Sequence, residues 1–323
     1  MNPFKLEKGL RIENLKAYYF TSTGAVKAVD NISFALSDGE SLGIAGESAC
    51  GKSTLGLCMM RMLQPPGKIV DGKVILNGTD VASMNEKEFT KTVRWKRIAM
   101  VFQGAMNALD PVYSVKDQLK EVLTQHGFPQ EKMTERIREV VKQVGLDPSV
   151  INRYPHELSG GMKQRIVIAM ALILKPEFVI ADEPTTALDV LVQAQIINLL
   201  KKLKKEGMTI MLITHDLAII SEIADKIGIM YAGEIIEFGS AEQIYKEPKH
   251  PYTQALIAAI PRLKDEKKQV SYIKGNPPNL LDPPKGCRFY DRCAHAMDVC
   301  KQEPPLIKIK DGYVRCWLYE NEQ

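Results

Sequence analysis

With 323 residues, the chain is longer than one average domain and is expected to hold one large domain with an appendage. Its 45% hydrophobic and 25% charged residues are ordinary for a globular protein, and a net charge of +4 does not by itself indicate a nucleic-acid partner. No secretory signal and no run of eighteen apolar residues is found, so neither export nor a membrane span is expected. In the cytosolic setting that this implies, the six cysteines are not expected to form structural disulfides.

Short apolar runs alternate with longer amphipathic stretches from about residue 10 to residue 235. The runs 41–45, 178–181 and 210–213 predict buried strands, and the alternation predicts an α/β fold with a largely parallel sheet covered by helices. Residues 108–158 interrupt this alternation of strands and helices with two successive helical patterns, 115–126 and 131–144. They predict an inserted helical subdomain.

The segment Gly46–Thr54 matches the phosphate-loop pattern G-x-x-x-x-G-K-[ST], between a predicted strand and a helix that begins near Lys52. Backbone N–H groups of such a loop and helix start surround phosphates. Lys52 is expected to reach the terminal phosphates, and the Ser53 hydroxyl is expected to ligate magnesium.

Two carboxylates follow the predicted strand 178–181. Asp182 at the strand end is expected to hold magnesium, and Glu183 is expected to act as the general base toward the attacking water. A third predicted strand is followed by His215, which taken alone is more simply explained as a core or surface histidine.

A second candidate anion site is the helix start at Ser159-Gly160-Gly161, where Ser159 is a suitable N-cap. Two glycines there leave backbone N–H groups open to an anion. Two anion-binding helix starts in one chain indicate that the second one binds a nucleotide held by another chain.

These motifs resemble those of the ATP-binding cassette (ABC) ATPases over residues 10–262. The resemblance implies a P-loop cassette with a mostly parallel core sheet, an antiparallel β subdomain and an inserted helical subdomain. It also implies that two cassettes close face to face on two ATP molecules. Gln103 matches the family's Q-loop, residues 186–189 match its D-loop, and His215 matches its γ-phosphate-sensing histidine. Ala49 and Cys50 stand where the family often has Gly and Ser, and ATP binding is expected to tolerate them.

The residue roles that the resemblance implies are as follows. The expected catalytic residues are Lys52, Gln103, Glu183 and His215. The expected nucleotide contacts are Tyr19 (in preference to Tyr18, as the aromatic on adenine), Gly46, Glu47, Ser48, Ala49, Cys50, Gly51, Lys52, Ser53, Thr54, Gln103, Ser159, Gly160, Gly161, Asp182 and Asp189. The expected magnesium ligands are Ser53, Gln103 and Asp182.

The amino-acid composition of the chain changes after about residue 245. Nine of the eighteen prolines lie between Pro248 and Pro305, and four of the six cysteines follow residue 286. This predicts a separate, loop-rich tail joined through the charged stretch 264–268. The expected division is a cassette at 7–262, with its helical subdomain at about 108–160, and an extension at 263–323.

The tail cysteines are Cys287, Cys293, Cys300 and Cys316, spaced C-x5-C-x6-C-x15-C. The spacing fits neither paired zinc motifs nor ferredoxin runs well, so it leaves both a bound metal and reduced thiols in a small core open.

The tail also resembles the C-terminal extension of dipeptide/oligopeptide permease ATPases, on His250-Pro251-Tyr252-Thr253 and on residues 285–293. Members of that subfamily carry a [4Fe–4S] cluster on such cysteines, which implies iron–sulfur here, with zinc as the alternative.

The subfamily resemblance implies an ATP-hydrolysing subunit of a binding-protein-dependent importer, on the cytoplasmic face of the membrane. The expected partners are a second, related ATPase, two membrane permease subunits and, indirectly, an external solute-binding protein, with no nucleic acid. The expected solute is a di- or oligopeptide, with nickel or oligosaccharides as alternatives. A non-transport cassette acting on nucleic acid or ribosomes is the remaining alternative class.

Overall fold

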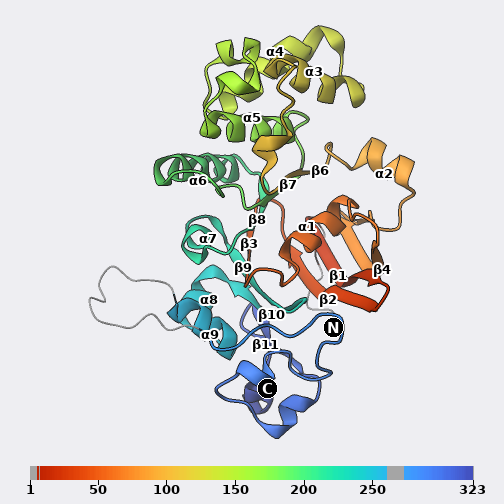
Figure 1. Cartoon of the computed structure of the whole chain (residues 1–323), viewed down its shortest axis with the longest axis vertical. Helices are drawn as coiled ribbons and strands as arrows, with labels where there is room; N and C mark the ends of the chain where they lie inside the picture. The colour runs from red at the N-terminus through yellow and green to blue at the C-terminus, as the bar shows by residue number, and fades with distance from the viewer. Residues whose placement is uncertain (1–5, 7, 260–272, 323) are drawn as a thin grey trace. The chain divides into compact units, whose positions relative to one another are not determined.

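The computed structural model describes residue 6, residues 8–259 and residues 273–322, so the charged stretch 264–268 lies outside the described residues. The chain divides into two compact units, one made of Met1–Ala82 and Ile213–Gln323 and the other of Ser83–Leu212 (Figure 1). Residues 273–322 therefore cluster with the amino-terminal segment. In the described ranges, no helix has the length and apolar character needed to cross a membrane.

The first unit contains an antiparallel sheet with the strand order β2-β1-β4-β5. Its strands are β1 (Leu10–Thr21), β2 (Gly24–Leu36), β4 (Gly67–Leu76) and β5 (Thr79–Asp80). Several residues of β1, among them Leu10, Ile12 and Leu15, are buried, as expected for a sheet with one covered face. Helix α1 (Lys52–Met60) packs against β1 and β2.

A second set of strands in this unit is hydrogen-bonded in the order β3-β9-β10-β12-β11. The strands are β3 (Ser41–Ala45), β9 (Lys226–Tyr231), β10 (Glu234–Ser240), β11 (Leu306–Ile309) and β12 (Gly312–Arg315). β3 and β9 are parallel and the other pairs are antiparallel, so this sheet is mixed. All five residues of β3 are buried, which confirms the predicted strand 41–45.

Three helices accompany these strands: α7 (Leu217–Ile223), α8 (Ala241–Lys246) and α9 (Pro251–Ala258). Helix α7 packs closely on β3, because a Cβ atom at Gly43 would lie 2.3 Å from Cγ2 of Ile220. A side chain at this position would push the helix off the strand.

The tail differs from the expected separate segment. Its hairpin of β11 and β12 joins the sheet, because β12 pairs with β10 through Glu237 opposite Val314. The ring of Tyr313 stacks on Phe238, with centroids 5.6 Å apart, and the Tyr313 hydroxyl donates to the carbonyl of Ser33 at 2.8 Å. A sheet edge with open N–H and C=O groups favours such pairing, so the hairpin of the tail extends the sheet of the first unit. Three short 3₁₀ helices in the tail agree with its loop-rich composition: Tyr290–Arg292, Asp298–Lys301 and Trp317–Glu322.

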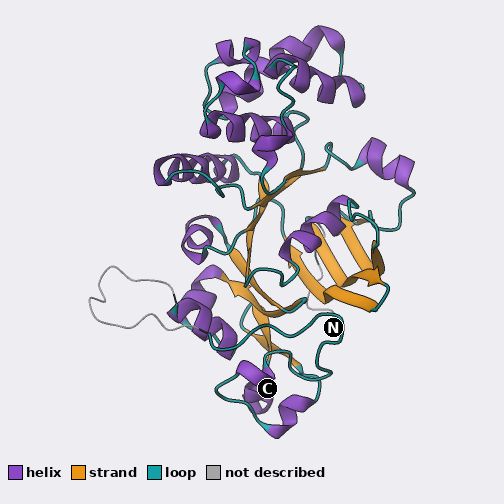
Figure 2. Ribbon diagram, in the orientation of Figure 1, coloured by secondary structure: helices purple, strands orange, loops and turns teal. Residues whose placement is uncertain are grey.

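The second unit combines three strands with a group of helices (Figure 2). The strands β6 (Ile98–Val101), β7 (Phe178–Asp182) and β8 (Thr209–Ile213) run in the order β8-β7-β6, and β8 ends at the boundary with the first unit. The helices are α2 (Glu86–Thr92), α3 (Val115–Gln125), α4 (Gln130–Gln143), α5 (Gly160–Leu172) and α6 (Val190–Lys205). Short 3₁₀ helices span Ala105–Ala108, Pro148–Asn152 and Pro155–Glu157.

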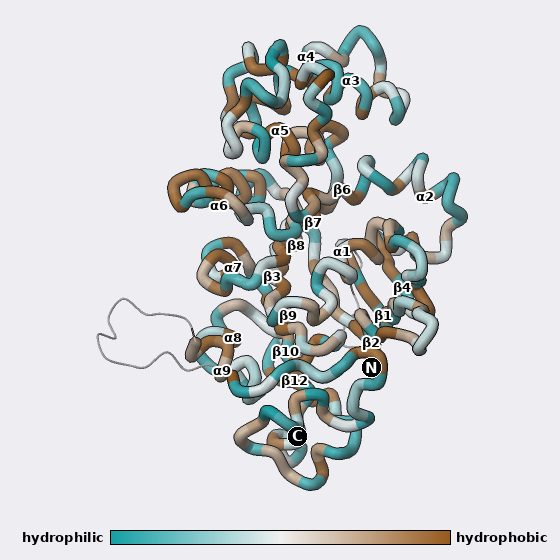
Figure 3. Tube along the Cα trace, viewed as in Figure 1, coloured by the Kyte–Doolittle hydropathy of each residue, from teal (hydrophilic) through white to brown (hydrophobic). Residues whose placement is uncertain are grey.

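Every residue of β7 and β8 is buried, and Figure 3 shows the hydrophobic character of both strands. This confirms the predicted strands 178–181 and 210–213. Helices α3 and α4 match the two helical patterns predicted at 115–126 and 131–144 to within one residue at each end.

Candidate functional site

The phosphate loop lies between β3 and α1 in the first unit. Gly46 and Gly51 have φ angles of 153° and 103°, and a Cβ atom at either would lie within 2.0 Å of a backbone oxygen, of Met230 and Ala28 respectively. Only glycine fits at both positions, so the loop conformation follows from the motif itself. Ser53 and Thr54 lie in the first turn of α1, which presents its open N–H groups toward the loop.

Lys52 is 7% exposed, and its amino group donates to the carbonyls of Gly46 and Glu47 at 2.8 and 2.9 Å. The amino group therefore lies inside the curve of the loop, where the phosphates of a nucleotide bind in this motif. Cys50 Sγ is 3.9 Å from the same nitrogen, and burial raises the pKa of the Cys50 thiol. Cys50 is thus a neutral packing residue of the loop.

The expected adenine-stacking residue, Tyr19, lies on β1. Its ring covers Gly67 of β4, since a Cβ atom there would lie 2.7 Å from Cε1 of Tyr19. The neighbouring Tyr18 has a different role, because its hydroxyl donates to Asp30 at 2.6 Å. His215 is exposed just after β8, beside Asp216, which caps α7 by accepting from the N–H of Ala218 at 2.8 Å.

The remaining predicted residues lie in the second unit. Asp182 closes β7 and is 2% exposed. Glu183 follows in the left-handed region with a φ of 48°, and its carboxylate accepts a hydrogen bond of 3.0 Å from the Thr186 hydroxyl. A non-glycine residue in this region is strained, and such strain is common where a side chain must be aimed for function. Gln103 lies in the turn after β6, and Asp189 caps α6 through the N–H of Val192 at 2.9 Å.

The helix start at Ser159-Gly160-Gly161 has the N-cap that its sequence predicts. The Ser159 hydroxyl accepts from the N–H of Met162 at 3.4 Å. Around Gly160 there is room, because a Cβ atom at this position would come no closer than 3.7 Å to its neighbours. Gly161 has no such room, because a Cβ atom would lie 2.6 Å from Val192 Cγ1. Gly160 is therefore the open position of the pair, and Gly161 is required by packing against α6.

Two arginines fix the helix that carries this start. Arg165 of α5 donates to the carbonyls of Val144 and Gly145, both at 3.1 Å, at the end of α4. Arg136 of α4 donates to the carbonyls of Leu172 and Ile173, at 2.8 and 2.6 Å, at the end of α5. Each helix end thus receives guanidinium donors for carbonyls that have no partner within the helix.

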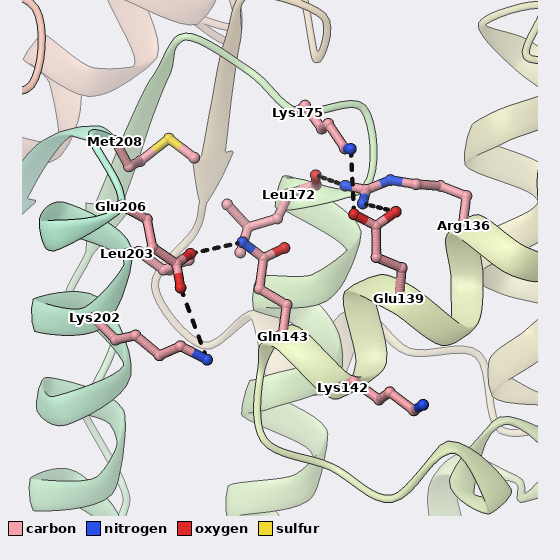
Figure 4. Close-up of a pocket in the computed structure, with 10 residues that line it drawn as sticks. All are labelled: Arg136, Glu139, Lys142, Gln143, Leu172, Lys175, Lys202, Leu203, Glu206 and Met208. Atoms are coloured by element: carbon pink, nitrogen blue, oxygen red, sulfur yellow. Dashed lines mark hydrogen bonds and ion pairs between the residues drawn. The ribbon is translucent and has the colours of Figure 1, made fainter.

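A cavity of about 580 Å³ lies next to Arg136 and is separate from every predicted site residue (Figure 4). Its walls carry internally paired charges: Glu139 lies between Arg136 and Lys175, at 2.8 and 3.2 Å, and Glu206 pairs with Lys202 at 3.8 Å. Each of these charges is already neutralised by its partner, so the paired side chains offer little to a charged ligand.

The four tail cysteines line one small cavity in the first unit, together with His250, Tyr290, His295 and Trp317 among others. Burial raises the pKa of Cys287 to about 12 and that of Cys316 to about 11, and the neighbouring sulfurs add to the shift. The N–H of His295 donates to Cys293 Sγ at 3.4 Å. In the described ranges, no three His, Cys, Asp or Glu side chains are arranged to hold a single metal ion.

The same tail reaches the phosphate loop, which the sequence did not predict. Arg292 donates to both carboxylate oxygens of Glu47, each at 2.8 Å, and the Tyr252 hydroxyl accepts from the Glu47 N–H at 2.9 Å. Arg288 pairs with Asp30 and donates to the carbonyl of Ala232. Tyr252, Arg288 and Arg292 lie inside the two tail motifs noted in the sequence, but spacing alone gave them no role.

The fold and the site residues define a nucleotide-binding cassette of the P-loop class. A model of the ABC transporter family matches residues 29–186, and a model of the oligopeptide/dipeptide transporter C-terminal region matches residues 236–300.

Known proteins match over nearly the whole chain. A dipeptide transport ATP-binding protein of Caldanaerobacter subterraneus is 45% identical over 317 residues, covering 96% of this chain and 97% of the relative. An oligopeptide transport ATP-binding protein of Escherichia coli is 45% identical over 314 residues, covering 95% and 91%. Among solved structures, a dimeric post-hydrolysis ATP-binding cassette bound to ADP and Pi is 28% identical, with a TM-score of 0.63, and covers 72% of this chain and 98% of that one.

The chain belongs to the ABC transporter ATP-binding proteins, in their dipeptide/oligopeptide subfamily. It is an ABC ATPase that hydrolyses ATP to drive transport.

Proposed function

We propose that the chain is the ATP-hydrolysing subunit of an importer of dipeptides or oligopeptides. The observation that carries the proposal is the combination of a complete cassette with a tail that matches the oligopeptide/dipeptide transporter region at residues 236–300. ATP binding closes the cassette on a second one, and hydrolysis reopens the pair, which drives alternating access in the membrane partners.

In this proposal the ATP phosphates bind in the loop Gly46–Thr54, with Lys52 at the terminal phosphates and Tyr19 on the adenine. Ser53, Gln103 and Asp182 hold magnesium, which neutralises the phosphate charge when it is bound. Glu183 accepts the proton of the attacking water, and His215 contacts the γ-phosphate. Asp189, as the cap of α6, positions the D-loop.

Ser159, Gly160 and Gly161 complete the nucleotide site of the opposite cassette in this account. The support is the open helix start at Gly160 and the dimeric, nucleotide-bound state of the similar solved cassette. The partners are a second, related ATPase, two permease subunits at the cytoplasmic face of the membrane and an external solute-binding protein. The functional division follows the sequence prediction, with a cassette at 7–262, a helical subdomain at about 108–160 and an extension at 263–323.

The four tail cysteines are proposed to hold a [4Fe–4S] cluster. They line one cavity, an N–H group donates to Cys293 Sγ, and such hydrogen bonds to sulfur are typical of cluster sites. The cluster would crosslink a tail that is too small to form a core of its own.

Two experiments test the proposal. Full-length protein purified without oxygen should be brown and contain about four irons per chain; colourless protein with one tightly bound zinc would contradict the cluster assignment. The importer assembled with its co-purified membrane subunits should show ATP turnover stimulated by peptide-loaded binding protein. Stimulation by nickel or oligosaccharides in place of peptides would refute the assigned solute.

A further inference from the structure

The connection between the tail and the phosphate loop is the strongest feature that the cassette motifs do not explain. Arg292 ends the short 3₁₀ helix Tyr290–Arg292 of the tail, and Glu47 is the second residue of the phosphate loop, 245 positions earlier in the chain. The two guanidinium nitrogens of Arg292 meet the two carboxylate oxygens of Glu47 at 2.8 Å each. Paired contacts of this kind are the strongest and most directional arginine–carboxylate interactions.

The arginine is itself held on several sides. It is 6% exposed, its Nε donates to the carbonyl of Lys274 at 2.9 Å, and Nη1 donates to the Tyr231 hydroxyl at 3.1 Å. Its guanidinium carbon lies 5.6 Å from the ring centre of Tyr231 and 5.8 Å from that of Phe289. The side chain is thus fixed by contacts other than Glu47, so the contact costs little conformational entropy.

Glu47 is likewise held at three points. Its carboxylate accepts from Arg292, its N–H donates to the Tyr252 hydroxyl at 2.9 Å, and its carbonyl accepts from the Lys52 amino group at 2.9 Å. Glu47 therefore contacts both Arg292 of the tail and Lys52, the lysine expected at the phosphates.

The charge of Glu47 gives the contact a consequence for nucleotide binding. A carboxylate in a loop that surrounds polyphosphate repels it, and at partly buried positions the repulsion is weakly screened. The Glu47 side chain is 25% exposed, and Arg292 neutralises its charge through contacts to both carboxylate oxygens.

We propose that Arg292 is a positioning residue for ATP, through which the cysteine-bearing tail holds Glu47 and sets the affinity of the phosphate loop for nucleotide. Loss of Arg292 leaves the charge of the Glu47 carboxylate uncompensated in the loop that binds the phosphates. ATP affinity then falls, while the chemical step, which depends on other residues, is preserved. The inference rests on the proposed nucleotide-binding role of residues 46–54.

The test compares the full-length chain with Arg292→Gln, Glu47→Gln, the double variant Arg292→Gln/Glu47→Gln and the control Arg315→Gln. Arg315 lies in the same tail, on β12, and its ion pair is with Glu303 at 3.7 Å rather than with the loop. The readouts are the Kd of a fluorescent ATP analogue on the chain alone and KM and kcat in the assembled importer. Arg292→Gln should raise Kd and KM about tenfold with kcat within about twofold of the parent.

The double variant is decisive because it removes the charge that Arg292 neutralises. It should recover ATP affinity to within about threefold of the parent, and Arg315→Gln should leave the affinity unchanged. Arg292→Lys, which keeps the charge without the paired geometry, should lie in between and serves if Arg292→Gln does not fold. An unchanged Kd in Arg292→Gln, an equal loss in Arg315→Gln, or a double variant no better than Arg292→Gln would overturn the proposal.

Lys52→Ala separates this inference from the site assignment beneath it. If Lys52→Ala binds ATP as well as the parent, the proposed role of the phosphate loop fails. If Lys52→Ala loses ATP and Arg292→Gln does not, only the role of Arg292 fails.

Discussion

The hydroxyl of Thr186 donates a hydrogen bond of 3.0 Å to the carboxylate of Glu183. Because the backbone of Glu183 is in the left-handed region with a φ of 48°, the contact and the backbone together limit where this carboxylate can point. Thr186 belongs to the segment that matches the D-loop, so the candidate base and the D-loop are linked directly.

Replacing Glu183 by Gln keeps the shape of the side chain and removes its basicity. ATP binding should remain within about twofold, while steady-state turnover should fall by about 10²- to 10⁴-fold. The measurement is nucleotide affinity and ATP turnover on the same preparation, with Thr186→Val as the control for the hydrogen bond alone. Turnover at the parental rate in Glu183→Gln would remove the residue from its assigned role.

Gly160 and Gly161 should differ in how replacement by alanine changes the stability of the protein. Gly161→Ala places a methyl group 2.6 Å from Val192 Cγ1 and should lower the free energy of unfolding by about 1–3 kcal/mol. Gly160→Ala meets nothing closer than 3.7 Å and should be neutral or slightly stabilising, since alanine favours the helix. Denaturant unfolding measures both. If the packing explanation is correct, Val192→Ala should restore the stability of Gly161→Ala.

Asp30 should contribute stability that depends on pH. Burial opposes its ionisation, but hydrogen bonds from Tyr18 and Arg288 outweigh this and lower the pKa of the Asp30 carboxyl. A carboxyl whose pKa is lowered by folding stabilises the native state above its unfolded value of about 3.9, and this stabilisation is lost as the pH falls through the folded value.

Asp30→Asn should therefore lower the free energy of unfolding by about 1–3 kcal/mol at pH 7, with the difference from the parent shrinking as the pH falls below about 4. Urea unfolding between pH 3 and pH 7 measures it. The control is Asp298→Asn, because the ion pair of Asp298 with Lys301 is exposed to solvent. A difference that grows toward acid would contradict the assigned cause.

Arg136 should be important for the second unit. It is 5% exposed and serves two carbonyls at the end of α5, so Arg136→Met should cost about 2–4 kcal/mol of unfolding free energy. Lys142→Met, at an exposed position of the same cavity wall (Figure 4), is the matched control and should change stability by less than about 0.5 kcal/mol. Equal effects from the two variants would show that the buried hydrogen bonds of Arg136 do not carry its stability contribution.

The sequence was sufficient for elements whose local pattern determines their structure. The apolar run 41–45 and the glycines at 46 and 51 predict a strand and a phosphate loop, and the structure shows that no residue but glycine fits at those two positions. The helix start at Ser159 is also predictable from the sequence, because an N-cap hydrogen bond joins residues only three positions apart.

The contacts of the tail could not be predicted in this way. Glu47 and Arg292 are separated by 245 positions, and neither residue belongs to a spacing pattern that would pair them. The pairing of β12 with β10 likewise depends on which edge of the sheet is open, a property of the assembled fold and not of a local segment. The composition thus marks the tail as a segment of different character, but composition does not show that its hairpin pairs with the sheet.

The most direct test of the account is ATP turnover by the assembled importer with Gly160→Asp in this chain. A Cβ atom at this position meets nothing closer than 3.7 Å and an acidic side chain is favourable in the first turn of a helix, so folding and ATP affinity of the isolated chain should match those of Gly160→Ala. A carboxylate at the helix start should repel the phosphates of the nucleotide on the opposite cassette, so turnover should fall by at least about 10²-fold. Full turnover in Gly160→Asp, with normal folding and ATP binding, would contradict a nucleotide site that is completed by two chains.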